Sequence, residues 1–136
     1  MKWTIDTSSL PGFLTVKTVG APATGDSHAL WDELLTNDHW HSGMCILFDN
    51  RKLERYPSDG TGSEMISAAL NFFESRIETI GNSRIAVLIG PRENFIYHRQ
   101  FQYGLSLRGL PANMQMFFKE KEAKEWLGSC TRAANA

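Results

Sequence analysis

Short apolar stretches alternate with amphipathic segments along the chain. β-Branched and aromatic residues fill 1–6 and 13–20, and the turn-forming sequence TSSLPG separates them. These two segments are therefore predicted to be neighbouring strands of an antiparallel hairpin. Two further segments, 44–49 and 84–90, are almost continuously apolar, which is typical of strands that helices cover on both faces. The segment 113–118 is expected to form the last strand.

Segments with apolar residues at helical spacing lie between these strands. The segment 25–35 begins with cap-forming residues and then repeats its apolar positions at intervals of three and four, so it is predicted to be a helix. The strongest pattern spans 62–80, where the apolar positions form one stripe and Gly81 provides a stop signal. Less regular or shorter helices are expected at 93–107 and 119–127.

The predicted element order is ββαβαβαβα over 136 residues, which is the length of one ordinary domain. Strands that alternate with helices favour a mostly parallel sheet with right-handed crossovers. We therefore expect an α/β fold, a single-domain sandwich with a mostly parallel central sheet and helices on both faces. The domain is expected to span 1–127, and 128–136 are expected to form a flexible C-terminal tail.

Composition and charge narrow the classes of function. A formal net charge of -1 argues against a nucleic-acid partner, because proteins that bind polyanions usually carry a basic excess. The apolar runs are far shorter than a bilayer span, so no integral membrane segment is expected, and MKWTIDTSSLPG lacks the apolar core of a secretory signal. Cys45 lies in an apolar strand and Cys130 in a polar tail. Neither a disulfide framework nor a CxxC pair is expected, which fits a reduced, cytoplasmic location.

Three stretches of the chain resemble a known family. They read CILFDNRKLER, RIAVLIGPRENFIYHRQFQYGL and MQMFFKEKEAKEWL. Their shared pattern is an apolar strand ending in Asp, an Ala-Val-rich strand, a helix with Phe and Arg, and a final strand followed by an Ala-x-x-Trp-Leu helix. This pattern is similar to that of the SpoIIAA-like family, small bacterial proteins related in fold to STAS domains. The resemblance spans most of residues 1–127, and its last motif is Ala123, Trp126 and Leu127.

The resemblance implies a non-enzymatic module of four or five strands with flanking helices. Anti-sigma antagonists carry a phosphoacceptor serine in an Asp-Ser-x-Gly-like loop, just before the helix that follows the central strand. The corresponding loop here reads PSDGTGSE and lacks the Asp-Ser order. Members of the family also resemble lipid-binding SEC14 domains, which implies a small-ligand carrier as the alternative function.

The loop 56–65, YPSDGTGSEM, lies at the start of the longest predicted helix. Thr61 and Glu64 have the spacing of a capping box, which predicts a helix beginning one residue after Thr61 and requires no ligand. Loop amides at the positive end of a helix also offer an anion site, although neither GxxxxGK[ST] nor GxGxxG is present. Phosphorylation of Ser58, Thr61 or Ser63 would place negative charge beside the same helix end.

Polar residues also follow the two central strands. Asp49 and Arg51 lie at the end of the first, and Arg92 follows the second. Because ligands of open α/β sheets bind outside the carboxyl ends of the strands, these residues are candidates for a ligand or partner surface. The structural alternative is that Asp49 caps backbone amides and that Arg92 is solvated. The complete predicted surface is Asp49, Arg51, Ser58, Thr61, Ser63 and Arg92.

Other reactive residue types give weaker signals. His39 and His41 resemble a pair of metal ligands, but no Cys/His cluster completes a site, so neither a metal nor a cofactor is expected. His28 and His98 lie on predicted helices, where either could titrate near neutral pH. There is no GxSxG motif, and Cys45 lies in a buried strand, where thiols are usually inert.

These signals favour binding over catalysis. The leading interpretation is a non-enzymatic module that binds a protein partner or forms a homodimer. The alternative is a carrier of a small ligand, a lipid or nucleotide, as in SEC14-type domains. An apolar pocket of several hundred cubic ångströms would favour the carrier, whereas an exposed Phe72 or Tyr103 on a flat face would favour the interaction module. An enzyme that uses Asp49 and a histidine has the least support.

Overall fold

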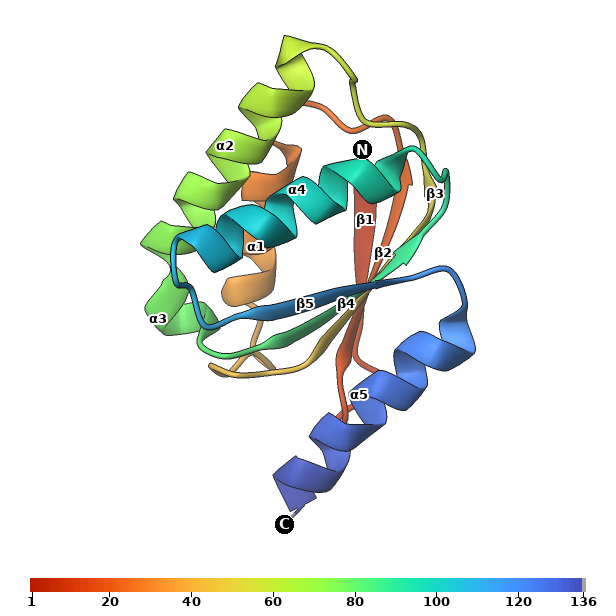
Figure 1. Ribbon diagram of the computed structural model, residues 1–136. Coiled ribbons are helices and arrows are strands. Elements are labelled where there is room, and N and C mark those ends of the chain that lie inside the picture. Colours follow the sequence, from red (N-terminus) through yellow and green to blue (C-terminus); the bar gives the residue numbers. More distant parts are fainter. Residues whose placement is uncertain (136) are drawn as a thin grey trace.

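A five-stranded sheet organises the described part of the chain (Figure 1). The computed structural model describes residues 1–135, except for the side chains of residue 129 and residues 131–135. The strands lie in the order β1-β2-β3-β4-β5. β1 and β2 are antiparallel, and the other three pairs are parallel. The strands are β1 (Lys2–Asp6), β2 (Leu14–Gly20), β3 (Ile46–Leu53), β4 (Arg84–Ile89) and β5 (Asn113–Phe117).

Helices cover both faces of this sheet. Figure 1 shows α1, α2 and α4 on one face and α5 on the other. The expected α/β sandwich, with an N-terminal hairpin and a mostly parallel sheet, is therefore confirmed. The helices are α1 (Asp26–Leu35), α2 (Gly60–Ser75), α3 (Ile77–Ile80), α4 (Asn94–Leu107) and α5 (Glu120–Asn135).

Alternation along the central strands produces two apolar cores. On β3, Ile46 and Phe48 pack beneath α1, α2 and α4, whereas Leu47 packs beneath α5. Successive side chains of a strand point to opposite faces, so a continuous apolar run fills both cores at once. The core beneath α5 consists of Cys45, Leu47, Ala86, Leu88, Ala123 and Leu127.

The predicted helix 62–80 is interrupted. α2 ends at Ser75, Arg76 has φ -115°, and α3 continues to Ile80. The segment before β3 explains the change of direction, because it supplies donors to the carbonyls of α3. Trp40 Nε1 donates to the Thr79 carbonyl at 2.9 Å, and the Gly43 amide donates to Ile80 at 2.9 Å. The apolar stripe predicted the buried face correctly but did not reveal these tertiary contacts.

The start of α2 also differs from the prediction. The N-cap is Asp59, and its Oδ1 accepts a hydrogen bond from the Thr61 amide at 3.0 Å. The prediction that Thr61 and Glu64 form a capping box is therefore wrong, and the helix begins earlier, at Gly60. A carboxylate at the N-cap also suits the positive end of the helix dipole.

Replacing the cap tests this assignment. We expect Asp59→Ala to lower the free energy of unfolding by about 1 kcal/mol, because an amide of the first turn loses its acceptor. Thr61→Ala is the matched control and should cost clearly less. Urea denaturation of the two variants measures the difference. A larger loss for Thr61→Ala would restore the capping box that the sequence suggested.

The last helix extends beyond the expected end of the domain. The sequence predicted a helix at 119–127 followed by a flexible tail, whereas α5 continues to Asn135. Residue 136 lies outside the described residues. A disulfide between Cys45, directly before β3, and Cys130 joins the extended helix covalently to the sheet.

This disulfide overturns the expectation that the two cysteines are unpaired. They are separated by 85 positions in the sequence, so their spacing carries no signal of pairing. Cys45 belongs to the core beneath α5, and only the docking of that helix brings Cys130 next to it. The argument for a reduced, cytoplasmic location loses the support of free thiols. Within residues 1–135, the structure has no helix with the length and apolar character needed to cross a bilayer.

Candidate functional site

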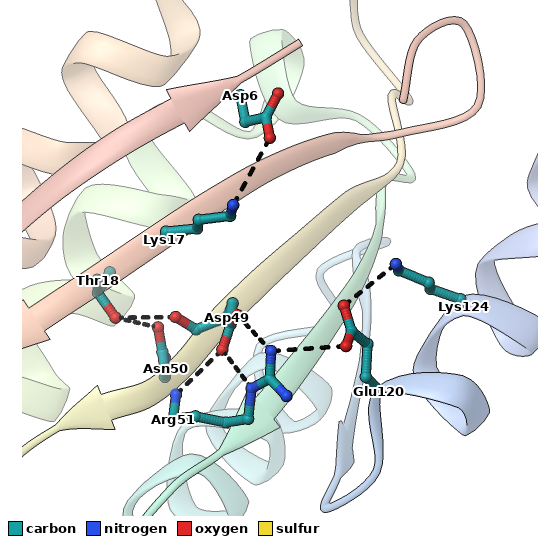
Figure 2. A network of polar contacts seen from close by, with 8 residues as sticks. All are labelled: Asp6, Lys17, Thr18, Asp49, Asn50, Arg51, Glu120 and Lys124. Carbon is teal, nitrogen blue, oxygen red and sulfur yellow. Dashed lines mark hydrogen bonds and ion pairs between the residues drawn. The ribbon is translucent and has the colours of Figure 1, made fainter. Parts of the chain in front are cut away.

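An ion-pair network joins β3 to the start of α5 (Figure 2). Arg51 donates from Nε to Oδ1 of Asp49 at 2.9 Å and from Nη2 to Oδ2 at 2.8 Å. The same guanidinium lies 3.6 Å from Oε2 of Glu120, and Oε1 of that carboxylate lies 3.1 Å from Nζ of Lys124. The sequence assigned Asp49 and Arg51 to one surface, and the structure places them in direct contact.

Arg51 determines the charge state of Asp49. Its side-chain hydrogen bonds hold the pKa of Asp49 below the ordinary value, although partial burial opposes this shift. Asp49 is therefore ionised at neutral pH and is poorly suited to act as a general base, which works best with a pKa near the working pH. Asp49 Oδ1 also accepts a hydrogen bond from the Arg51 backbone amide at 3.3 Å, as the structural interpretation expected, and Arg51 connects Asp49 to Glu120 at the start of α5.

A second cluster surrounds Phe118, directly after β5. The Phe118 ring stacks with that of Phe95 at a centroid distance of 5.9 Å, and the Arg92 guanidinium lies 5.6 Å from the Phe118 centroid. Phe118 is nevertheless 51% exposed. It precedes Glu120 by two residues, so this cluster adjoins the ion-pair network. We call Arg51, Arg92, Phe95, Phe118 and Glu120 the sheet-end surface.

The loop residues Ser58, Thr61 and Ser63 do not join the sheet-end surface. All three are exposed at the start of α2. Among the described residues, no hydrogen bond, ion pair or ring contact connects them to that surface. The structure thus separates the single predicted surface into two parts. Phosphorylation of these hydroxyls stays a prediction, and the helix dipole favours negative charge at this position.

Polar side chains also gather on the opposite face of the sheet, beneath α1, α2 and α4. Thr18 Oγ1 donates to Oδ1 of Asn50 at 2.6 Å (Figure 2), and both side chains are buried. His98 of α4 is 6% exposed, and its Nε2 has no hydrogen-bond partner among the described residues. Burial lowers the pKa of His98 to about 4. The expectation that this histidine could titrate near neutral pH is therefore wrong.

The sequence contains a signal for these residues. Thr18 and Asn50 each lie two residues after a buried apolar residue of the same strand, so they face the side of the sheet that α1, α2 and α4 cover. His98 lies three residues before Phe101 on the buried side of α4. A polar residue at a position whose periodicity predicts burial is more informative than an exposed polar residue. Polar residues at positions that the periodicity assigns to the core would therefore have identified Thr18, Asn50 and His98 from the sequence.

Two neighbouring small cavities lie on this face of the sheet. The inner cavity has a volume of about 80 Å³, and its wall includes Thr18, Asn50 and His98. The outer cavity, of about 150 Å³, lies between α2 and the segment that leads into α1. Tyr56 and Tyr97 line both cavities, and their rings stack at 3.6 Å. Drug-sized ligands usually occupy pockets of about 300–1,000 Å³, so neither cavity accommodates the expected lipid or nucleotide.

Of the two aromatic residues whose exposure would favour a partner surface, one is exposed. Tyr103 is 65% exposed on α4, whereas Phe72 is buried and its ring lies 4.1 Å from that of His28. The expectation for Phe72 is wrong because α1 packs beside α2 and covers this side chain. His39 and His41 are exposed, and the described residues contain no group of three or more potential metal-ligating side chains.

Comparison with known proteins supports the fold. No protein-family model matches the chain, and no curated protein matches it. The crystal structure of an uncharacterized protein of the DUF3478 family from Shewanella loihica PV-4, with a SpoIIAA-like fold, is similar, with a TM-score of 0.56 and 16% sequence identity. The match covers 93% of this chain and 92% of that chain. The chain therefore has a SpoIIAA-like fold, as the sequence resemblance implied.

Proposed function

We propose that the chain is a non-enzymatic protein-binding module and that its partner docks on the sheet-end surface. The observation that carries this proposal is Phe118, which is half exposed and yet held by Phe95 and Arg92. A side chain that is already ordered loses little conformational freedom when it binds. Aromatic and arginine residues also dominate the binding free energy of many protein interfaces.

The charges of this surface indicate the chemistry of the partner. Arg51 is neutralised by Asp49 and Glu120. Arg92, by contrast, forms no ion pair with a carboxylate of the described residues and rests on the Phe118 ring. Its guanidinium donors are available for an acidic group, and arginine binds carboxylates with two parallel hydrogen bonds. We therefore expect a protein segment that presents an apolar side chain to Phe118 and a carboxylate to Arg92.

The state of Asp49 supports binding rather than catalysis. Asp49, the acidic residue of the predicted site, is engaged by Arg51 and has a lowered pKa, which makes it a weak base.

The cytoplasmic location that the sequence favoured and the Cys45–Cys130 disulfide point to different compartments, because disulfides persist mainly in oxidising ones. The proposed binding function depends on neither location.

Affinity measurements on matched variants test this proposal. A partner captured by the full chain from its own host should be purified and its Kd measured for the wild type and Phe118→Asp. We expect Phe118→Asp to weaken binding by at least about 30-fold, because the loss of a central aromatic contact usually costs 2 kcal/mol or more. Arg92→Glu should weaken binding too, by repelling the partner's carboxylate.

Leu107→Asp is the matched control. Leu107 is 70% exposed near the end of α4, so it receives the same apolar-to-acidic change away from the sheet-end surface. Its Kd should equal that of the wild type. Equal losses in the Leu107 and Phe118 variants, or none in either, would contradict the proposal. A concentration-dependent dimer that Phe118→Asp dissociates would identify the partner as a second copy of this chain.

A further inference from the structure

The inner cavity is a second candidate site. Unlike the exposed sheet-end surface, it is lined mostly by buried side chains. Rings from three elements surround it, with Trp31 from α1, Phe48 from β3 and Phe101 from α4. The polar wall residues, Thr18, Asn50 and His98, come from three different elements and lie within this apolar lining. A mostly apolar cavity with a few convergent polar groups is the usual form of a small-molecule site.

His98 is the strongest indication that the cavity has an occupant. Its Nε2 is buried and has no partner among the described residues. Buried polar side-chain atoms nearly always have a hydrogen-bond partner, and an exception calls for an explanation such as an unplaced water or ligand. The ring is neutral at pH 7 because burial lowers its pKa to about 4. A neutral imidazole offers one donor and one acceptor.

The Thr18–Asn50 pair adds a second polar group with a defined orientation. The hydroxyl of Thr18 donates to the amide oxygen of Asn50 at 2.6 Å and also approaches the Asp49 carbonyl at 3.4 Å. This contact engages the oxygen of the Asn50 amide. Its Nδ2 group takes part in none of the hydrogen bonds found among the described side chains, so it is available to an acceptor in the cavity. The wall can therefore bond both to a donor and to an acceptor.

Tyr56 and Tyr97 lie between the two cavities. Their stacked rings belong to both cavities, and each lies edge-on to His98 at a centroid distance of 5.5 Å. Asn94 positions Tyr56, since its Oδ1 accepts the Tyr56 amide at 2.9 Å and its Nδ2 donates to the Glu54 carbonyl at 3.1 Å. The aromatic pair thus separates the inner cavity from the outer one at a fixed position.

We propose that the inner cavity binds a small neutral molecule of about three or four non-hydrogen atoms, with an N–H or hydroxyl group that bonds to the polar wall. The volume of about 80 Å³ limits the size, since it is about half of the roughly 150 Å³ that accommodate the six carbon atoms of benzene. The apolar rings exclude an ionised ligand, because burying an unpaired charge is costly. The site is independent of the sheet-end surface and goes beyond the proposed protein-binding function.

Acetamide and acetone provide a matched pair of probes. Both have the same number and arrangement of non-hydrogen atoms, but only acetamide carries N–H groups. In titrations of the full chain followed by amide resonances, we expect acetamide to give saturable shifts at Tyr56, Tyr97 and Phe101. Acetone should bind at least tenfold more weakly. This comparison uses the wild-type protein, so it does not depend on the folding of any variant.

Two variants locate the interaction. His98→Leu should weaken acetamide binding at least tenfold, whereas His39→Leu, which changes an exposed histidine, should leave it unchanged. Absence of saturable binding by either probe would mean that the cavity holds water only and would overturn the proposal. Equal affinity for acetamide and acetone, with no effect of His98→Leu, would also overturn it, because the polar wall would then recognise no polar group of the ligand.

Discussion

Reduction of the Cys45–Cys130 disulfide is expected to lower the free energy of unfolding by about 3 kcal/mol. The bond connects residues 85 positions apart, so breaking it greatly increases the conformational freedom of the unfolded chain. It also releases α5, which covers the core that contains Leu47 and Leu88. Urea denaturation with and without a reducing agent measures the change.

The double variant Cys45→Ala/Cys130→Ala is the control for this experiment. It has no disulfide, so its stability should be insensitive to the reducing agent and close to that of the reduced wild type. Amide hydrogen exchange should show faster opening of α5 in the reduced protein than of β3 and β4, which helices cover on both faces. Equal stability of the oxidised and reduced wild type would show that the disulfide is not needed to hold α5 on the sheet.

The architecture was predictable because hydrophobic periodicity reports burial. The continuous apolar runs of 44–49 and 84–90 predicted strands covered on both faces, and the register of β3 and β4 places Ile46 beside Ile85 in a parallel pair. The β-branched and aromatic residues on either side of the turn sequence TSSLPG likewise predicted the hairpin, in which Thr4 lies beside Lys17. These features depend on local pattern and on general rules of connection.

The features that were missed depend on contacts between distant segments. The break at Arg76 follows from donors in the segment around Trp40, and nothing near Arg76 in the sequence interrupts the helical pattern. The pairing of Cys45 with Cys130 follows from the docking of α5. Local propensity cannot encode either contact, so both appear only when the elements are packed together.

The candidate site was predicted in part. The rule that ligands bind at the carboxyl ends of parallel strands drew attention to Arg51 and Arg92. β3 continues to Leu53, beyond the expected end at Asp49, so Arg51 lies within the strand, and the role of both arginines at a partner surface stays a prediction. The rule did not identify Phe118, because adjacent aromatic residues on a strand are expected to be covered on both faces of a sandwich. α5 begins at Glu120 and leaves the Phe118 ring half exposed, so the loop between β5 and α5 decides its exposure.

The buried group around His98 predicts a dependence of stability on pH. The pKa of His98 in the folded protein is about 4, below the ordinary value of 6.5. As the pH falls below 6.5, the unfolded chain therefore binds this proton before the folded chain does. The contribution of neutral His98 to folding stability is fully present above pH 6.5 and is lost as the pH falls from there toward 4. Carboxylates with lowered pKa values, such as Asp49, lose their contribution at more acidic pH.

Between pH 7 and pH 5, the wild type should therefore lose about 2 kcal/mol of unfolding free energy, since each unit of pKa difference corresponds to about 1.4 kcal/mol. His98→Leu should remove most of this loss, whatever its own stability at pH 7, because the group that takes up the proton is absent. His39→Leu should keep it, since His39 is exposed. Urea denaturation of the three proteins at both pH values measures the effect. If His98→Leu retained the full loss, the proton would be taken up elsewhere, and His98 would have to be accessible to solvent in the folded protein.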